Sequence, residues 1–111
     1  MTTDVTLPPA VDTYLRAPKD ELGSIAGSLF TGDAVVHDDG RTHEGVAAIR
    51  DWADGVAAAF TYTRTVTDTT RRRDAAIVRV RVDGDFPGGP VTLHHHFSLD
   101  DGKISALTIC T

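Results

Sequence analysis

The chain has 111 residues, of which 41% are hydrophobic and 24% charged, ordinary proportions for one globular domain over residues 1–111 with one core and a modest pocket. The net charge of −5 argues against a general nucleic-acid binder. The longest apolar runs fall short of the roughly 18 residues that predict a membrane span.

The single cysteine, Cys110, excludes an internal disulfide framework and fits a reducing cytoplasm, where we expect the protein to reside. The first ten residues, MTTDVTLPPA, lack the basic start and apolar core of a signal peptide. One basic cluster, residues 71–73, lies beside Asp74 and is predicted to be a solvated hairpin turn.

Three helices are predicted in the first half of the chain. The first begins at the Pro8-Pro9 pair and ends near Arg16, where a proline two residues on opposes continuation. Apolar residues at helical spacing predict a second helix over 19–30 and a third over 46–59.

Strands occupy most of the rest. An apolar run ends at Asp38, and the turn signal Asp39-Gly40 lets residues 41–44 return as a second short strand. Further strands are predicted over 61–70, 75–83, 91–99 and 103–110. Helices followed by long antiparallel strands predict an α+β domain with helices covering one face of a curved sheet.

Asp38 is the first candidate for chemistry. Strand alternation places it on the same face as Ala34 and Val36, at the mouth of an apolar space. Desolvation raises the proton affinity of a carboxylate, which suits a proton-transferring group. The alternative is an Asx-turn residue that caps the following turn, a role that Asp39 serves equally well.

The triplet at 94–96 invites a metal interpretation, but a strand separates its members. His95 shares the inward face with Leu93 and Phe97, while His94 and His96 point outward, so we expect no metal site. His95 is then either a core histidine satisfied by a polar neighbour or a hydrogen-bond donor within a pocket.

Tyr14 lies on the apolar stripe of the first helix, either as a packing residue or as a donor aimed into the same cavity. The expected pocket walls are Val36, Trp52, Phe60 and Phe97. Nucleophile-elbow, phosphate-loop and H-E-x-x-H signatures are absent from the sequence.

Three segments carry a family resemblance: VDTYLRA (11–17), SLFTGDAVVHDDGRTHEGVAAIRDW (28–52) and GDFPGGPVTLHHHFSLDDGKISAL (84–107). With them, nearly the whole chain resembles the nuclear transport factor 2-like superfamily, and within it small bacterial SnoaL-like proteins. The resemblance implies a cone-shaped, curved antiparallel sheet wrapped around N-terminal helices, a cystatin-like roll with an apolar pocket. Its members include ketosteroid isomerases, polyketide cyclases, limonene epoxide hydrolases and binding or scaffold domains without catalysis, so the fold alone does not settle function.

The isomerase branch gives the sharpest comparison. Its pocket tyrosine matches Tyr14, its proton-shuttling aspartate matches Asp38, and its second oxyanion donor, a protonated aspartic acid, falls at His95. That last departure argues against steroid isomerisation itself. The epoxide hydrolase branch needs an Asp-Arg-Asp arrangement. Because Arg79 and Arg81 alternate with inward valines, no arginine is expected in the pocket and this branch is not expected.

The sequence therefore suggests a protein that binds an apolar, carbonyl-bearing small molecule without a cofactor. If it is an enzyme, Asp38 is the base and Tyr14 and His95 stabilise the oxyanion. The alternative is a non-catalytic ligand-binding or dimerisation module with a plugged pocket. Relatives commonly pair through the outer face of the sheet, which implies a homodimer here, with an interface that includes Thr92, His94, His96, Arg79 and Arg81.

Overall fold

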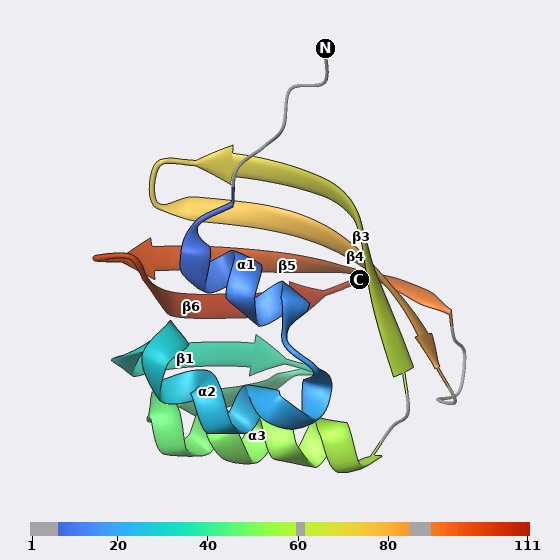
Figure 1. Cartoon of the computed structure of the whole chain (residues 1–111), viewed down its shortest axis with the longest axis horizontal. Coiled ribbons are helices and arrows are strands. Elements are labelled where there is room, and N and C mark those ends of the chain that lie inside the picture. The colour runs from blue at the N-terminus through green and yellow to red at the C-terminus, as the bar shows by residue number, and fades with distance from the viewer. Residues whose placement is uncertain (1–6, 60–61, 85–89) are drawn as a thin grey trace.

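Helices pack against one face of a curved sheet in the computed structural model, which describes residues 7–59, 62–84 and 90–111 (Figure 1). The elements in chain order are α1 (Pro9–Arg16), a 3₁₀ turn η1 (Lys19–Glu21), α2 (Leu22–Leu29), β1 (Phe30–Asp38), β2 (Arg41–Glu44), α3 (Gly45–Ala59), β3 (Tyr62–Arg72), β4 (Ala75–Gly84), β5 (Val91–Asp100) and β6 (Lys103–Cys110). This is the α+β arrangement predicted from the sequence, with each expected element present.

The second predicted helix differs from the structure at both ends. It begins as the 3₁₀ turn η1 after Pro18, and α2 ends at Leu29. Phe30 is extended, with φ −108° and ψ 149°, and pairs with Ile104 as the first residue of β1. Helical spacing of apolar residues continues through Phe30, so periodicity alone placed this residue in the helix.

The sheet has the strand order β2-β1-β6-β5-β4-β3. Neighbouring strands are antiparallel, as predicted, except for β1 and β6, which run parallel. The sheet is therefore mixed. Residue alternation indicates which face a side chain occupies but not the direction of the neighbouring strand, so this parallel pair could not be predicted from the alternation.

The core lies between the helices and the inner face of the sheet. On β4, the inner residues Ala76, Val78, Val80 and Val82 are buried, as their alternation predicts. Residues of α1 and α2 cover them from the other side, and Tyr14 contacts the rings of Phe30 and Phe97 edge-on. These contacts place α1 directly over the middle of the sheet.

Two tight turns, at Asp39-Gly40 and Asp101-Gly102, connect neighbouring strands. Asp39 and Gly40 have φ of 52° and 73°, and Asp101 and Gly102 have φ of 50° and 81°. Aspartate tolerates this left-handed region and glycine adopts it without steric cost, so both Asp-Gly pairs form the turns that the sequence predicts. The first turn leaves Asp38 at the end of β1.

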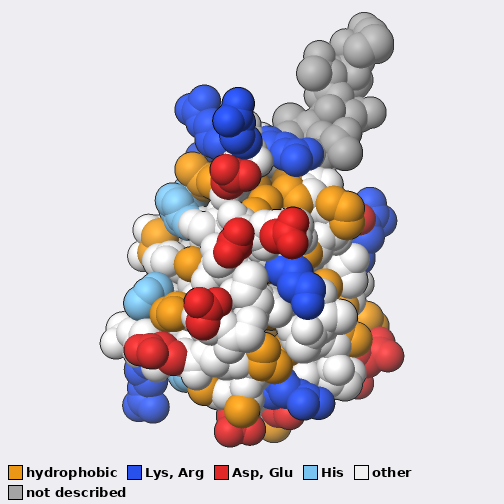
Figure 2. All heavy atoms as spheres, turned by 90° about the vertical axis from the view of Figure 1, so that its left-hand side faces the viewer, with side chains coloured by type: hydrophobic (Ala, Val, Ile, Leu, Met, Phe, Trp, Pro, Cys, Tyr) orange, Lys and Arg blue, Asp and Glu red, His pale blue; other side chains and the backbone are white. Residues whose placement is uncertain are grey.

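The surface fits two further expectations. Arg71, Arg72 and Arg73 are exposed at the β3–β4 turn, as expected for a solvated hairpin, and basic and acidic side chains are interspersed on this side of the molecule (Figure 2). In the part of the chain that the structure describes, every helix is too short or too polar to cross a membrane.

Candidate functional site

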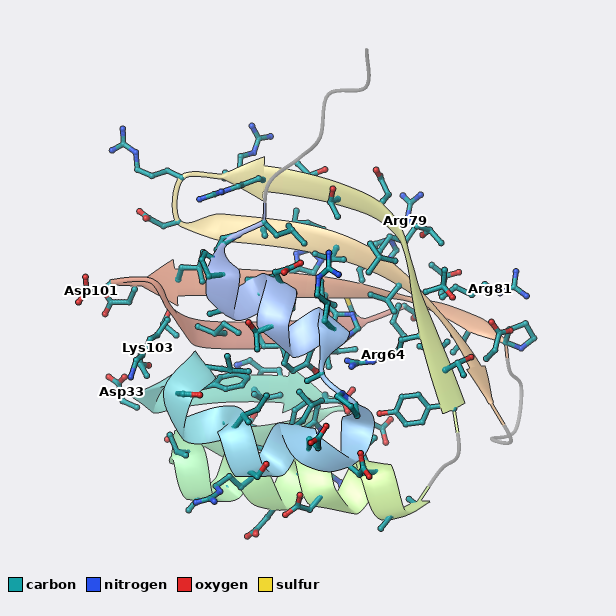
Figure 3. The ribbon with its side chains drawn as sticks, viewed as in Figure 1. Asp33, Arg64, Arg79, Arg81, Asp101 and Lys103 are labelled. Atoms are coloured by element: carbon teal, nitrogen blue, oxygen red, sulfur yellow. The ribbon has the colours of Figure 1, made fainter. Side chains whose placement is uncertain are left out.

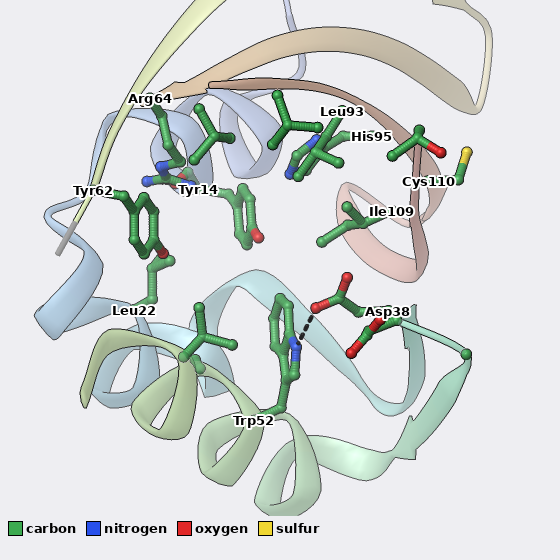
Figure 4. Close-up of a pocket in the computed structure, with 17 residues that line it drawn as sticks. Tyr14, Leu22, Asp38, Trp52, Tyr62, Arg64, Leu93, His95, Ile109 and Cys110 are labelled. Carbon is green, nitrogen blue, oxygen red and sulfur yellow. Dashed lines mark hydrogen bonds between the residues drawn. The ribbon is translucent and has the colours of Figure 1, made fainter. Parts of the chain in front are cut away.

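A cavity of about 650 Å³ lies between the helices and the inner face of the sheet (Figure 4). This volume is within the range typical of small-ligand sites. Much of the wall is apolar and is contributed by Leu22, Ala53, Val56, Val82, Leu93 and Ile109. A few polar side chains project between these residues, and they determine what the cavity can do chemically.

Tyr14 reaches the cavity from α1 and is only 3% exposed. Figure 4 shows its hydroxyl pointing into the space enclosed by the lining residues. Burial raises the pKa of this hydroxyl well above its ordinary value of 10, and the positive charge of Arg64 offsets part of that rise. Tyr14 therefore keeps its proton at neutral pH and can act as a hydrogen-bond donor.

Asp38 reaches the cavity from the opposite side, at the end of β1. Its side chain is half-buried because Ala34 and Val36, on the same face of the strand, are fully buried while the strand itself ends here. One carboxylate oxygen, Oδ2, accepts a hydrogen bond of 3.0 Å from Nε1 of Trp52 on α3 (Figure 4). The carboxylate is thus held in place at the cavity rim.

His95, on β5, also lines the cavity; it is 3% exposed, and its ring centroid lies 6.2 Å from that of Tyr14. Its Nδ1 is buried and has no hydrogen-bond partner among the described residues. Burial is the main cause that lowers its pKa to about 4, and the positive charge of Arg64 adds to the effect. The imidazole is therefore neutral at neutral pH, and its unpartnered nitrogen is a place where a ligand atom would relieve an unfavourable burial.

Of the four residues predicted to form the pocket wall, one lines the cavity in the structure, two are packed in the core and one is not described. Trp52 lines the cavity. Val36 and Phe97, at 0% and 1% exposure, face inward but are packed within the core and do not line it. Phe60 lies outside the described residues. An inward-facing residue contacts the cavity only where helices leave space above it, and sequence alternation does not report that space.

Arg64, on β3, also lines the cavity, and sequence reasoning missed it. The expectation that no arginine points inward was wrong. Figure 3 shows Arg64 directed toward the space beneath α1, whereas Arg79 and Arg81 point away from it. Its guanidinium Nη2 donates hydrogen bonds to the carbonyl oxygens of Ala17, at 3.0 Å, and of Tyr14, at 3.4 Å.

A register shift explains why Arg64 was missed. The β3–β4 pairing proceeds regularly from Arg72 opposite Ala75, but Thr67 is an extra residue between two successive pairs. This bulge turns the first half of β3 over, so Arg64 lies opposite the inward-facing Val82. Without the bulge, Arg64 would lie opposite Asp83 on the outer face.

The Asp-Arg-Asp arrangement is nevertheless not formed by the residues described. Arg64 contacts the Tyr14 ring, with Cζ 5.5 Å from the ring centroid, and no described carboxylate lies within ion-pair distance of it. Within the same residues, no group of three or more histidine, cysteine or acidic side chains is arranged to hold a metal ion. His94 and His96 lie on the outer face of β5, as alternation predicts.

The fold is that of the nuclear transport factor 2-like superfamily. The model of the SnoaL-like domain family matches residues 19–107, and the chain belongs to this family. No curated protein matches the sequence.

Solved structures support the same conclusion. A proposed polyketide cyclase from Sinorhizobium meliloti is 37% identical, with a TM-score of 0.80, and the match covers 94% of this chain and 95% of that one. A protein with a ketosteroid isomerase-like fold from Catenulispora acidiphila, in complex with trimethylamine, has a TM-score of 0.80 at 20% identity and covers 96% and 87%. An epoxide hydrolase of the limonene epoxide hydrolase-like type from M. tuberculosis has a TM-score of 0.73 at 15% identity and covers 92% and 79%. The last two likenesses concern the fold alone.

Proposed function

We propose that this protein binds a small molecule with an apolar body and a carbonyl group, and that it moves a proton at the carbon next to that carbonyl. The observation that carries this proposal is the position of Asp38, Tyr14 and His95 around one cavity with largely apolar walls. The similarity to a proposed polyketide cyclase at 37% identity favours the same class of chemistry.

In the proposed reaction, Asp38 accepts the proton and the electron pair of the broken C–H bond moves to the carbonyl oxygen. The enolate oxygen then carries a developing negative charge, which preorganised donors stabilise most effectively where water is excluded. The Tyr14 hydroxyl and an N–H of neutral His95 supply those donors. Returning the proton to another carbon gives an isomer. Attack of the enolate carbon on a second carbonyl moves that carbonyl's electron pair to its oxygen, which takes the proton back from Asp38, and the product is a ring. The side chains suffice for either outcome, so no cofactor is needed.

The test is incorporation of solvent deuterium into a panel of cyclic ketones and polyketide-like compounds, measured by mass spectrometry. Binding is measured in parallel through the fluorescence of Trp52, the single tryptophan of the chain, which lines the cavity. We expect at least one compound that binds to exchange faster with protein than in buffer. Compounds that bind without any accelerated exchange would instead support the non-catalytic binding module.

We also propose that the protein forms a homodimer through the outer face of the sheet. Ile77 is 38% exposed on this face, and His96 and Arg79 lie on the same side of adjacent strands. Members of the nuclear transport factor 2-like superfamily commonly pair in this way. An apolar side chain among polar ones suits an interface with a modest apolar centre.

A further inference from the structure

Arg64 supplies the positive charge of the cavity and is not used in the proposed proton transfer. Among the described lining residues it is the one lysine or arginine. Figure 4 shows its guanidinium near the rings of Tyr62 and Tyr14, with Asp38 on the opposite side of the cavity. The cavity therefore has a positive end and a negative end.

The guanidinium is held in place by neutral groups. Its two hydrogen bonds both use Nη2 and both go to carbonyl oxygens at the end of α1. An arginine carries five N–H donors in a planar fork, so these contacts orient the group without neutralising it. No described carboxylate lies within ion-pair distance, although a partly buried charge ordinarily has such a partner.

The positive charge of Arg64 acts on two other polar groups that line the cavity, His95 and Tyr14. It lowers the pKa of His95, after the larger effect of burial, and it opposes the burial that raises the pKa of Tyr14. Both effects require that the charge of Arg64 reaches the atoms a ligand would contact. A ligand with a negative group at this end would therefore meet an oriented cation that forms no ion pair with the described residues.

We propose that Arg64 binds a carboxylate on the ligand of this cavity, so that the substrate is a keto acid or a related carbonyl compound that carries an acid group. A planar carboxylate matches the guanidinium fork. A single cation balances one negative charge, which favours a carboxylate over a doubly charged phosphate. The inference rests on the proposed function only for the carbonyl, since binding of the acid group requires no turnover.

This anchoring also orients the ligand. Asp38, which lies opposite Arg64 in Figure 4, and the next residue, Asp39, both line the cavity and repel an anion, so the acid group is expected at Arg64. The apolar body would then span the aliphatic wall and bring the carbonyl toward Tyr14 and His95. Since the chain has a net charge of −5, long-range electrostatics disfavours anions in general. A preference for the acid would then point to a specific contact.

The test compares ligands of matched shape. The probes are 4-oxocyclohexanecarboxylate and 4-oxo-4-phenylbutanoate, each beside its neutral carboxamide, and binding is followed at neutral pH and low salt by calorimetry or Trp52 fluorescence. We expect at least one acid to bind about tenfold or more tightly than its amide, as a charge-assisted contact predicts. Equal affinity within both pairs, or no binding of either acid at millimolar concentration, overturns the proposal without any variant.

Variants assign the preference to its residue. Arg64→Gln should remove the acid preference, Arg64→Lys should keep part of it, and Arg81→Gln, on the outer face, should keep all of it. Preference retained by a folded Arg64→Gln overturns the proposal. If that variant does not fold, Arg64→Lys decides: a reduced or abolished acid preference supports the contact with the guanidinium fork, and a preference retained in full overturns it. If the amides exchange deuterium and the acids do not bind more tightly, the proposed function stands and this inference is refuted. If the acids bind more tightly but no compound exchanges, this inference stands and the proposed proton transfer is refuted.

Discussion

Nε1 of Trp52 donates a hydrogen bond to Oδ2 of Asp38 at 3.0 Å and thereby joins the middle of α3 to the end of β1. The bond occupies one carboxylate oxygen and fixes the plane of the group. Trp52 also packs near His43, whose ring centroid is 6.0 Å away, which limits how far the indole can turn. A base that must meet a C–H bond at a defined angle benefits from such restraint, because catalysis depends on orientation as well as proximity.

Trp52 is accordingly predicted to position the base. Trp52→Phe keeps an aromatic wall but removes the donor, so the deuterium-exchange rate at saturating ligand should fall by about tenfold. The concentration for half-saturation should change little. Measuring rate and half-saturation separately checks this. A loss confined to binding would mean that Trp52 acts only as a wall.

Tyr14→Phe removes one of two proposed oxyanion donors. Loss of one such donor typically lowers a rate by about a hundredfold or more. We expect a loss of that order in exchange, smaller than that caused by removing Asp38, because His95 remains. Ring packing against Phe30 and Phe97 is preserved in the variant, so the melting temperature is a suitable control. An unchanged exchange rate would exclude Tyr14 from the reaction.

Buried neutral His95 should make the protein sensitive to mild acid. Its pKa is about 4 in the folded protein against an ordinary 6.5, so the unfolded chain binds the proton more readily between these values. The free energy of unfolding should therefore decrease as the pH falls from 6.5 toward 4, with a contribution on the order of 3 kcal/mol once the pH is below both values. Above pH 6.5 the contribution is absent.

Urea denaturation of wild type and His95→Gln at pH 7, 6 and 5 measures the contribution of His95 to the free energy of unfolding. The glutamine variant should lose less stability on acidification than wild type. His43→Gln, at a partly exposed position on β2 and outside the proposed interface, is the control histidine and should follow wild type. Parallel losses in wild type and His95→Gln would contradict the burial of a neutral imidazole.

The proposed dimer should also respond to pH. His94 and His96 lie on the outer face with Arg79 and Arg81 on the neighbouring strand, and His37 lies on the same face of β1. Protonating imidazoles there would add positive charge to an interface that already contains arginines. We expect the dimer to weaken on acidification, because added like charges repel one another across the interface. Sedimentation velocity at pH 7.5 and 5.5 measures this, and a monomer at neutral pH would refute the dimer.

The sequence predicted most of the fold because its local signals agree with one another. Both Asp-Gly turns and the inward face of β4 follow directly from backbone chemistry and alternation. It also indicated Tyr14 and His95, because each lies on the apolar face of its own element. What it missed depends on pairing between distant segments, namely the parallel β1–β6 pair and the bulge at Thr67 that turns Arg64 inward.

Comparison of wild type with Asp38→Asn tests the central claim most directly. The amide is nearly the same size and can still accept a hydrogen bond from Trp52, but it cannot take up a proton at neutral pH. With a compound that wild type exchanges, and with occupancy matched by fluorescence, deuterium incorporation by Asp38→Asn should fall by about a thousandfold or more while affinity changes little. Exchange by Asp38→Asn at the wild-type rate would contradict the account.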